Sequence, residues 1–274
     1  MNLYDADHIR NFYDQYADLE THRWDKSPVE QIKLYVHQHH LSTHINAGDK
    51  VLELGAGTGI FTEQLASITE KLTITDISPV QLALNQKRSQ ELDYASKVQD
   101  WGLADITDLA QFKDETFDKV VCYGGPLSYV FDKKHQALAE IKRVLKPGGK
   151  ALMSVMNLWG TTHQYLTAIM LEVPPAENEK VMTTGNLHPS SFTPSDHHCH
   201  MFRAEEFKTD LQQAGFEILT LSASNCLSAM RAAQLPEIKK DVNRWQYFLD
   251  LEIRACQSPG MIESGTHLIA VVQK

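Results

Sequence analysis

Between residues 50 and 156, strand-like and helix-like segments alternate, and this constrains the fold of the chain more than any other feature. Each short run of β-branched and aliphatic residues is followed by a longer segment whose apolar residues recur at helical spacing. Strands that alternate with helices pair in parallel through right-handed crossovers, so the pattern predicts a parallel sheet covered by helices on both faces. The predicted strands are 50–54, 72–75, 97–101, 117–123 and 150–156, and the predicted helices are 60–68, 79–92 and 135–145.

The rest of the chain divides around this region. The first residues show helical spacing, and a stretch rich in proline, serine and threonine later breaks the rhythm before helix and strand patterns return. We therefore expect a helical cap over 1–45, an α/β core over 46–157, an insertion or lid over 158–200, and completion of the core over 201–274 with a helical insertion near 224–261.

The composition limits the classes of partner. The chain has 274 residues and a formal net charge of -9, without a dense Lys/Arg run, so a nucleic acid substrate is disfavoured. Its four cysteines form no CxxC pair, which is typical of reduced thiols. We see neither a signal peptide nor an apolar run long enough to span a membrane, and expect a cytoplasmic protein. Monomer and homodimer both fit the sequence.

Three glycines follow the first predicted strand, in the run Val51-Leu-Glu-Leu-Gly-Ala-Gly-Thr-Gly59. In an open α/β sheet, ligands bind beyond the carboxyl ends of the strands, and glycines there let the backbone approach a ligand closely. Dinucleotide sites use GxGxxG, whose last glycine is replaced here by Ile60. Glu53 would repel a pyrophosphate but suits a ligand carrying an ammonium and a sulfonium, which favours S-adenosylmethionine over NAD.

Two acidic residues follow the next strands. Asp76 ends the second predicted strand, where a carboxylate accepts hydrogen bonds from both hydroxyls of a ribose. The competing role for Asp76, capping the helix at Pro79, can be filled by Ser78. Asp105 follows the third strand between Ala104 and Ile106, and either accepts from an adenine amino group or is a solvated turn residue.

These motifs together resemble the class I S-adenosylmethionine-dependent methyltransferases. The resemblance covers about residues 10–156, and the ending 265–274 is similar to the antiparallel last strand of that fold. It implies a doubly wound, Rossmann-like α/β fold with a seven-stranded, mostly parallel sheet, an antiparallel last strand, a helical N-terminal cap and a lid insertion. The motifs that carry it are Glu53–Gly59, Asp76, Ala104-Asp105, Phe117–Cys122 and Val144–Gly149.

The resemblance also implies roles for individual residues. The glycine loop would line the methionine end of S-adenosylmethionine, with Glu53 near its amino group, and Asp76 would hold the ribose. Opening residues similar to the first helix of small-molecule members, Phe12 to Ala17 and Arg23-Trp24, would fold over the cofactor, although surface packing explains them equally well. The cofactor-binding candidates are Tyr13, Arg23, Glu53, Gly55, Ala56, Gly57, Asp76, Ile77, Ala104, Asp105, Ile106, Cys122 and Tyr123.

The expected reaction is transfer of a methyl group to an N or O atom of a small molecule by in-line displacement, in which much of the catalysis comes from alignment. A general base is needed only if the acceptor must lose a proton. The catalytic candidates are His197, His198, His200 and Tyr123. His188 and the run 196–200 also contain zinc-ligand types, but adjacent ligands do not match the usual spacing, so we expect no metal. Tyr123, Tyr129, Trp159 and Tyr165 either line an apolar acceptor pocket or pack in the core.

Differences from the motifs of other methyltransferases of this fold narrow the class of possible methyl acceptors. After the fourth strand the chain has Tyr123-Gly-Gly-Pro-Leu-Ser-Tyr129, which is neither the Asn/Asp-Pro-Pro-Tyr motif of nucleic acid amino-methylating enzymes nor the Asp of magnesium-dependent catechol-type enzymes. The alternatives left open are an NAD-type dinucleotide-dependent oxidoreductase, a non-catalytic S-adenosylmethionine-binding protein, and an enzyme that methylates proteins.

Overall fold

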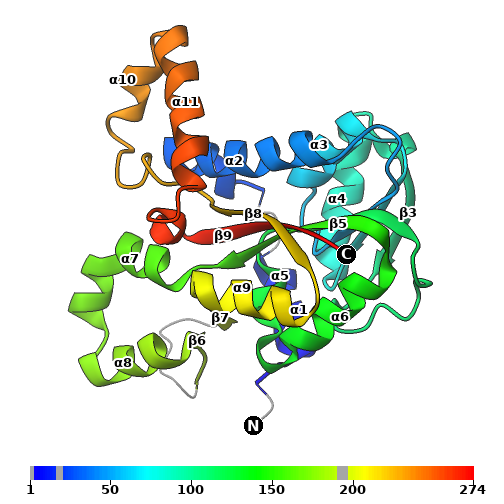
Figure 1. Cartoon of the computed structure of the whole chain (residues 1–274), viewed down its shortest axis with the longest axis horizontal. Coiled ribbons are helices and arrows are strands. Elements are labelled where there is room, and N and C mark those ends of the chain that lie inside the picture. Colours follow the sequence, from blue (N-terminus) through cyan, green and yellow to red (C-terminus); the bar gives the residue numbers. More distant parts are fainter. Residues whose placement is uncertain (1–2, 17–20, 190–196) are drawn as a thin grey trace.

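The structure, a computed structural model, describes residues 3–16, 21–189 and 197–274. Its main sheet has seven strands in the order β3-β2-β1-β4-β5-β9-β8 (Figure 1). The first five strands run parallel to their neighbours, whereas β9 is antiparallel to both β5 and β8, as expected. The strands are β1 (Val51–Leu54), β2 (Leu72–Asp76), β3 (Val98–Leu103), β4 (Phe117–Cys122), β5 (Leu145–Met156), β8 (Glu217–Ala223) and β9 (His267–Gln273).

Strand order reverses between β1 and β4, because the chain builds outward from β1 to β3 and then crosses back to start β4. This reversal is the topological switch point at which an open α/β sheet leaves a crevice beyond its strand ends. Helices cover both faces of the sheet (Figure 1). They are α2 (Pro28–His44), α3 (Ile60–Ile68), α4 (Pro79–Glu91), α5 (Pro126–Tyr129), α6 (Lys134–Val144) and α9 (Ala204–Gln213).

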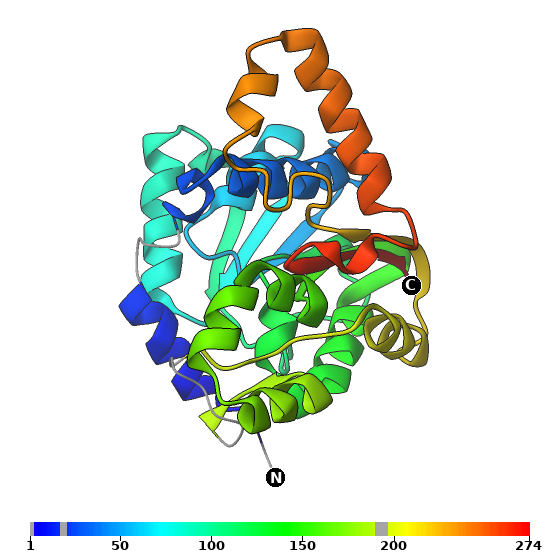
Figure 2. The same cartoon turned by 90° about the vertical axis from the view of Figure 1, so that its left-hand side faces the viewer.

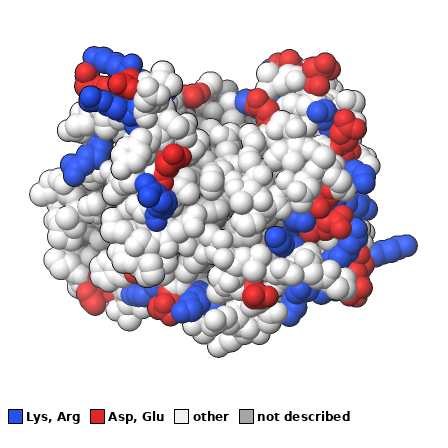
Figure 3. Space-filling model, turned by 45° about the horizontal axis from the view of Figure 1, so that its top comes forward, with Lys and Arg blue, Asp and Glu red and all other residues white. Residues whose placement is uncertain are grey.

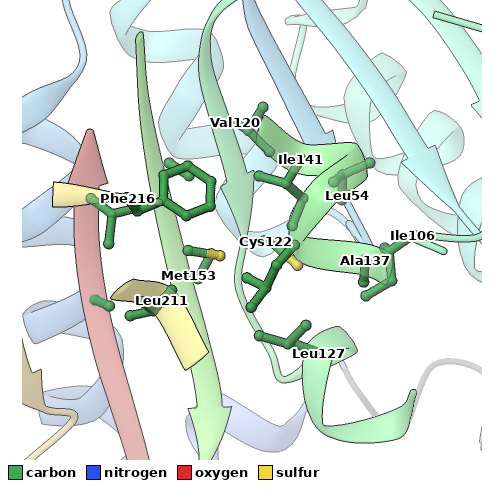
Figure 4. Packing of buried hydrophobic residues seen from close by; sticks show 14 of the residues in the cluster. Leu54, Ile106, Val120, Cys122, Leu127, Ala137, Ile141, Met153, Leu211 and Phe216 are labelled. Carbon is green, nitrogen blue, oxygen red and sulfur yellow. The ribbon is translucent and has the colours of Figure 1, made fainter. Parts of the chain in front are cut away.

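Alternating residues of the central strands pack into two separate cores, as the period of two in a strand requires. Val120 and Cys122 of β4 face α6 and α9, where Cys122 lies among Leu127, Ile141 and Met153 (Figure 4). Val121 and the following Tyr123 face the opposite side, toward residues of α2 and α3. Neighbouring side chains at the end of β4 therefore point into different parts of the molecule.

Most predicted elements form within one or two residues of their expected ends. The clearest difference is β5, which begins at Leu145 and not at residue 150. We expected Pro147 and Gly148 to separate the preceding helix from this strand. However, Leu145 already pairs with Phe117 of β4, and the register then shifts before Lys150 pairs with Lys119. A proline removes only one ladder donor, which a register shift accommodates.

The segment expected to be an insertion contains regular structure that the sequence did not predict. It forms α7 (Leu158–Glu172), α8 (Pro175–Thr184) and a two-stranded hairpin of β6 (Asn186–Leu187) and β7 (Cys199–His200), gathered at one end of the molecule (Figure 2). At the opposite end, the expected helical insertion forms α10 (Leu235–Lys239) and α11 (Val242–Cys256) (Figure 2). Within the described ranges, no helix is both long and apolar enough to cross a membrane.

The N-terminal cap consists of α1 (Ala6–Tyr16), the 3₁₀ turn η2 (Arg23–Asp25) and α2. Two contacts fasten α1 to the start of α4: the Ser78 hydroxyl donates to Asp14, and the Gln81 side-chain amide donates to the Tyr13 carbonyl at 3.0 Å. Ser78 also caps α4 by accepting from the Gln81 backbone N–H, which leaves the Asp76 carboxylate available for another role.

Candidate active site

A cavity open to solvent lies beyond the carboxyl ends of the central strands, at the switch point, and about 850 Å³ of empty space lies in it and in the solvent at its mouth. It brings together residues that follow β1, β2, β3 and β4 with residues of α1 and η2. Ten of the thirteen predicted cofactor residues line it: Tyr13, Gly55, Ala56, Gly57, Asp76, Ile77, Ala104, Asp105, Ile106 and Tyr123.

The glycine loop has a backbone that other residues rarely adopt. Gly55, Gly57 and Gly59 have φ angles of 66°, 55° and 92°. A Cβ atom at Gly55 would also overlap the ring of Pro126. Thr58, between Gly57 and Gly59, also lines the cavity, and its hydroxyl is buried without a hydrogen-bond partner within the described residues.

Asp76 is positioned by the loop it faces. Its Oδ2 accepts from the Gly57 N–H and its Oδ1 from the Ser78 N–H, each at 2.8 Å. Burial is the main cause that raises the pKa of this carboxyl to about 6, and the nearby Asp14 carboxylate adds to the rise, while the backbone donors oppose it. Each oxygen retains acceptor capacity on the cavity side, which suits the hydroxyls of a ribose.

Asp105 lies at the far end of the cavity, after β3. Its Oδ2 accepts from the Tyr4 hydroxyl at 2.7 Å, and its Oδ1 accepts from both the backbone N–H and the hydroxyl of Thr107 at 2.8 Å. Tyr4 lines the cavity, and its backbone N–H is held by Asp132. The turn around Asp105 is therefore ordered by its own hydrogen bonds and closed by the start of the chain.

Glu53, Cys122 and Arg23 do not line the cavity, in contrast to the sequence-based expectation. Glu53 is 2% exposed, and it faces α3, where its Oε2 accepts from the Thr62 hydroxyl at 2.6 Å. Burial raises the pKa of Glu53 to about 8. Cys122 faces the core on the α6 side, because successive side chains of β4 point to opposite faces of the sheet. The Arg23 guanidinium stacks over Trp24, with 4.6 Å between the guanidinium carbon and the ring centroid.

Aromatic side chains form the end of the cavity next to β4. Trp24, Phe61 and Tyr123 line this end, and their rings meet edge to face, with centroids 5.6 Å apart for Trp24 and Phe61 and 5.1 Å for Phe61 and Tyr123. Trp159 and Tyr165, considered as further walls of an acceptor pocket, lie on α7 and are 47% and 53% exposed. They do not line the cavity, whereas Tyr129 does.

A chain of hydrogen bonds runs along one wall. The Tyr13 hydroxyl donates to the Tyr129 hydroxyl at 2.6 Å, and the Tyr129 hydroxyl lies 3.0 Å from Nε2 of His197. Burial, followed by the charge of Arg23, lowers the pKa of His197 to about 4, so this imidazole is neutral at neutral pH and able to accept a hydrogen bond from Tyr129.

The other two candidate histidines lie elsewhere. His198 stacks on His8, with ring centroids 4.2 Å apart. His200 is held between Asn186 and Glu206, whose oxygens lie 2.7 Å from Nδ1 and Nε2 respectively. Asp196 is outside the described residues. Among the residues that are described, no group of three His, Cys, Asp or Glu side chains is arranged to hold a metal ion.

Several lining residues were missed by sequence reasoning, and some of them left a signal. Thr58, Ile60 and Phe61 belong to the loop and first helical turn after β1, where proximity to the glycines already indicates the site. Pro126 and Val130 follow β4 in the same way. Gln81 lies in the first turn of α4, just after β2, whereas Tyr4 and Ile9 reach the cavity through the tertiary packing of the N-terminal segment, which no local pattern predicts.

Comparisons with known proteins agree with this geometry. Residues 52–153 match the family model described as a methyltransferase domain. The ubiquinone biosynthesis O-methyltransferase of Xanthomonas euvesicatoria pv. vesicatoria is 30% identical over 150 residues, which are 53% of this chain and 60% of that protein. The demethylmenaquinone methyltransferase of Paenarthrobacter aurescens is 28% identical over 184 residues, 64% of this chain and 63% of that protein. The chain thus spans about three fifths of the length of these curated relatives.

A solved structure extends the likeness to the whole fold. The putative methyltransferase of Haloferax volcanii, in complex with the Trm112 methyltransferase activator, aligns with a TM-score of 0.61 at 18% identity, over 97% of this chain and 96% of that one. The family match covers the glycine loop, Asp76, Asp105 and β4. Residues 52–153 are therefore similar to a methyltransferase domain, and the likeness to the solved structure shows that the whole chain has the same fold.

Proposed function

We propose that this protein transfers a methyl group from S-adenosylmethionine to an N or O atom of a small molecule by in-line displacement. The observation that carries the proposal is a cavity in which the glycine loop and Asp76 adjoin an aromatic end at Tyr123. Bound S-adenosylmethionine supplies an activated methyl group. The remaining contribution of the chain is to hold the two reactants in line and to exclude water.

The residues at the cavity wall fit this cofactor. The carboxylate of Asp76 is placed to accept from ribose hydroxyls, and the unpartnered Thr58 hydroxyl to contact the methionine end beside the glycine loop. Ile77 and Ile106 offer apolar faces, and Asp105 an acceptor, on the side of β2 and β3. Tyr13 contributes from α1, which extends across the cavity from the start of α4.

A small acceptor fits the site better than a macromolecule. Residues of α1, η2 and α5 contribute to the walls of the cavity beside those that follow the strands, so it is lined from several sides. Lys/Arg and Asp/Glu side chains are intermixed around the face in Figure 3, with a broad uncharged area between them and no continuous basic patch. The names of the two curated relatives refer to methylation in quinone biosynthesis, which is also small-molecule chemistry.

We propose His197 as the base if the acceptor loses a proton. Its Nε2 lies 3.0 Å from the hydroxyl of a cavity residue, Tyr129. The pair Tyr13 and Tyr129 would carry the proton from the cavity to Nε2 of His197. We also propose that the segment 158–200, which supplies His197, acts as a lid over the acceptor side.

The test is a methyl-transfer screen with purified protein and S-adenosylmethionine labelled in its methyl group, against pools of small hydroxyl and amine compounds, with labelled products read by mass. Labelled product that is lost in Asp76→Asn supports the proposal. Tight cofactor binding without product from any pool indicates a non-catalytic binding protein, whereas labelled protein or RNA contradicts the assignment to a small acceptor.

A further inference from the structure

Tyr4, in the segment before α1, lies at the end of the cavity next to β2 and β3, where its hydroxyl is bonded to Asp105. Both side chains line the cavity, and neither is fully buried. The Tyr4 hydroxyl donates to Oδ2 of Asp105 at 2.7 Å. Methyl transfer as proposed above does not use Tyr4, so this polar residue of the cavity wall has no role assigned to it.

The position of Tyr4 is fixed by contacts outside the cavity. The carboxylate of Asp132, in the 3₁₀ turn η4 (Phe131–Lys133), accepts from the backbone N–H groups of Leu3 and Tyr4 at 3.0 and 3.2 Å. The Tyr4 ring packs against buried residues of two hydrophobic clusters. Burial is the main cause that raises the pKa of Tyr4, and the hydrogen bond to Asp105 adds to the rise, so the phenol keeps its proton. The hydroxyl therefore remains a donor to Asp105 at neutral pH.

The hydrogen bonds between these residues leave two neighbouring oxygens as acceptors. A carboxylate has about four acceptor positions. Oδ1 of Asp105 takes the N–H and the hydroxyl of Thr107, each at 2.8 Å, and Oδ2 takes the Tyr4 hydroxyl, so one position remains on Oδ2. The Tyr4 oxygen has given away its one hydrogen and presents lone pairs. The Thr107 hydroxyl also lies near the Tyr4 oxygen, but its single hydrogen is directed to Asp105.

A ligand atom that faces this pair has to carry a hydrogen, because an oxygen would meet lone pairs only. An amino group on a flat ring meets this condition, and Ile77 and Ile106 line the cavity with the apolar faces that such a ring needs. We infer that Tyr4, together with Asp105, selects the amino group of the adenine of S-adenosylmethionine, whose N–H is shared between the two oxygens in a three-centre hydrogen bond. The inference rests on the proposed function, because it concerns the cofactor site of that same cavity. Asp132 is then the positioning residue that holds Tyr4.

Binding of two ligands tests this without a known methyl acceptor. The unmodified protein is titrated by calorimetry with S-adenosylhomocysteine, the demethylated product, and with S-inosylhomocysteine, in which an oxygen replaces the amino group of the base. We expect S-adenosylhomocysteine to bind at least tenfold more tightly, because the oxygen forms no hydrogen bond with either acceptor. Equal affinity for the two ligands would overturn the inference, whereas binding of neither would overturn the proposed function itself and the inference with it.

Tyr4→Phe tests the contribution of Tyr4, because it keeps the ring and removes one oxygen. We expect the preference for S-adenosylhomocysteine over S-inosylhomocysteine to fall about three- to tenfold, which corresponds to one neutral hydrogen bond. Asp132→Ala should lower this preference too, and should lower it no further when combined with Tyr4→Phe. Tyr16→Phe is the matched control and should leave the preference unchanged, because Tyr16 ends α1 and is not among the described residues that line the cavity.

Two results with Tyr4→Phe would refute the inference. An unchanged preference, even with both ligands bound more weakly, would show that Tyr4 only closes the cavity. Tighter binding of S-adenosylhomocysteine would show that the Tyr4 hydroxyl competes with the base for Asp105.

Discussion

Neutralising Asp76 gives the sharpest test of how the cofactor is held. In Asp76→Asn, the buried carboxylate that accepts from Gly57 and Ser78 becomes an amide, with one acceptor oxygen in place of two. Hydrogen bonds to a charged group contribute about 1.5–3 kcal/mol each. Loss of one charged acceptor should therefore weaken binding of S-adenosylhomocysteine by about 2–3 kcal/mol, which is roughly 30- to 150-fold.

The pH dependence of the same binding reaction separates charge from shape. Because burial raises the pKa of Asp76 to about 6, a ligand that needs the carboxylate should bind about tenfold more weakly near pH 5 than near pH 7. In Asp76→Asn this dependence should disappear. Calorimetric titration of both proteins across this range is the assay. If the variant binds within about twofold of the unmodified protein, or if the unmodified protein shows no change with pH, Asp76 does not hold the ribose.

The same carboxylate should act in the opposite direction on the stability of the ligand-free protein. Its pKa is about 6 in the folded protein and 3.8 as the ordinary value, so the folded state holds the proton more tightly. The free energy of unfolding should then fall as pH rises from about 3.8 to about 6, with a total cost on the order of 3 kcal/mol above that range. Chemical unfolding measured with and without S-adenosylhomocysteine should show the ligand offsetting this loss.

Three further predictions concern residues in or next to the site. Glu53→Gln should be about as stable as the unmodified protein near pH 5 but more stable near pH 8.5, because burial raises the pKa of Glu53 to about 8 and its ionisation destabilises the fold. Urea unfolding at the two pH values checks this. Equal free energies of unfolding at both pH values would contradict it. Gly55→Ala should destabilise the protein by about 1–3 kcal/mol, because φ at this position is 66° and the added methyl group meets Pro126. Gly102→Ala is the control: nothing lies close to this position, so the same unfolding assay should show a much smaller loss of stability. If the acceptor loses a proton, His197→Gln should lower kcat at least tenfold and remove the lower limb of the pH–rate profile. His198→Gln should leave kcat and the profile unchanged. Identical profiles for the two variants would exclude His197 as the base.

Local sequence patterns were sufficient to predict that the residues following β1, β2 and β3 converge. The alternation of strands and helices defines which ends of β1, β2 and β3 meet, so the glycine loop, Asp76 and Asp105 were predicted to converge, and they line the cavity together. These residues follow consecutive strands of a parallel sheet, whose carboxyl ends lie at one edge. Their convergence needs no information about how distant segments pack.

The misplaced residues come from treating neighbours in a motif as neighbours in space. Cys122 and Tyr123 were assigned together, yet side chains alternate along a strand, so Cys122 enters the core with α6 while Tyr123 faces the cavity. Glu53 lies between Leu52 and Leu54, which pack on the α6 and α9 side, and is therefore turned to the opposite face under α3. Period-two reasoning applied to these strands would have placed both residues from the sequence alone.

The acceptor half could not be predicted in this way, because its walls come from four segments that are distant in the chain. Tyr13, Trp24, Phe61 and Tyr129 meet only after α1 packs across α4 and η2 packs beside α3, and His197 adds a contact over 68 positions from Tyr129. Each aromatic residue taken singly is as well explained by core packing. The surroundings of Tyr123, whose ring meets that of His37 edge to face, likewise arise only in the folded chain. The aromatic side of the cavity therefore depends on tertiary packing of the N-terminal cap, whereas the glycine loop depends on the local connection from strand to helix.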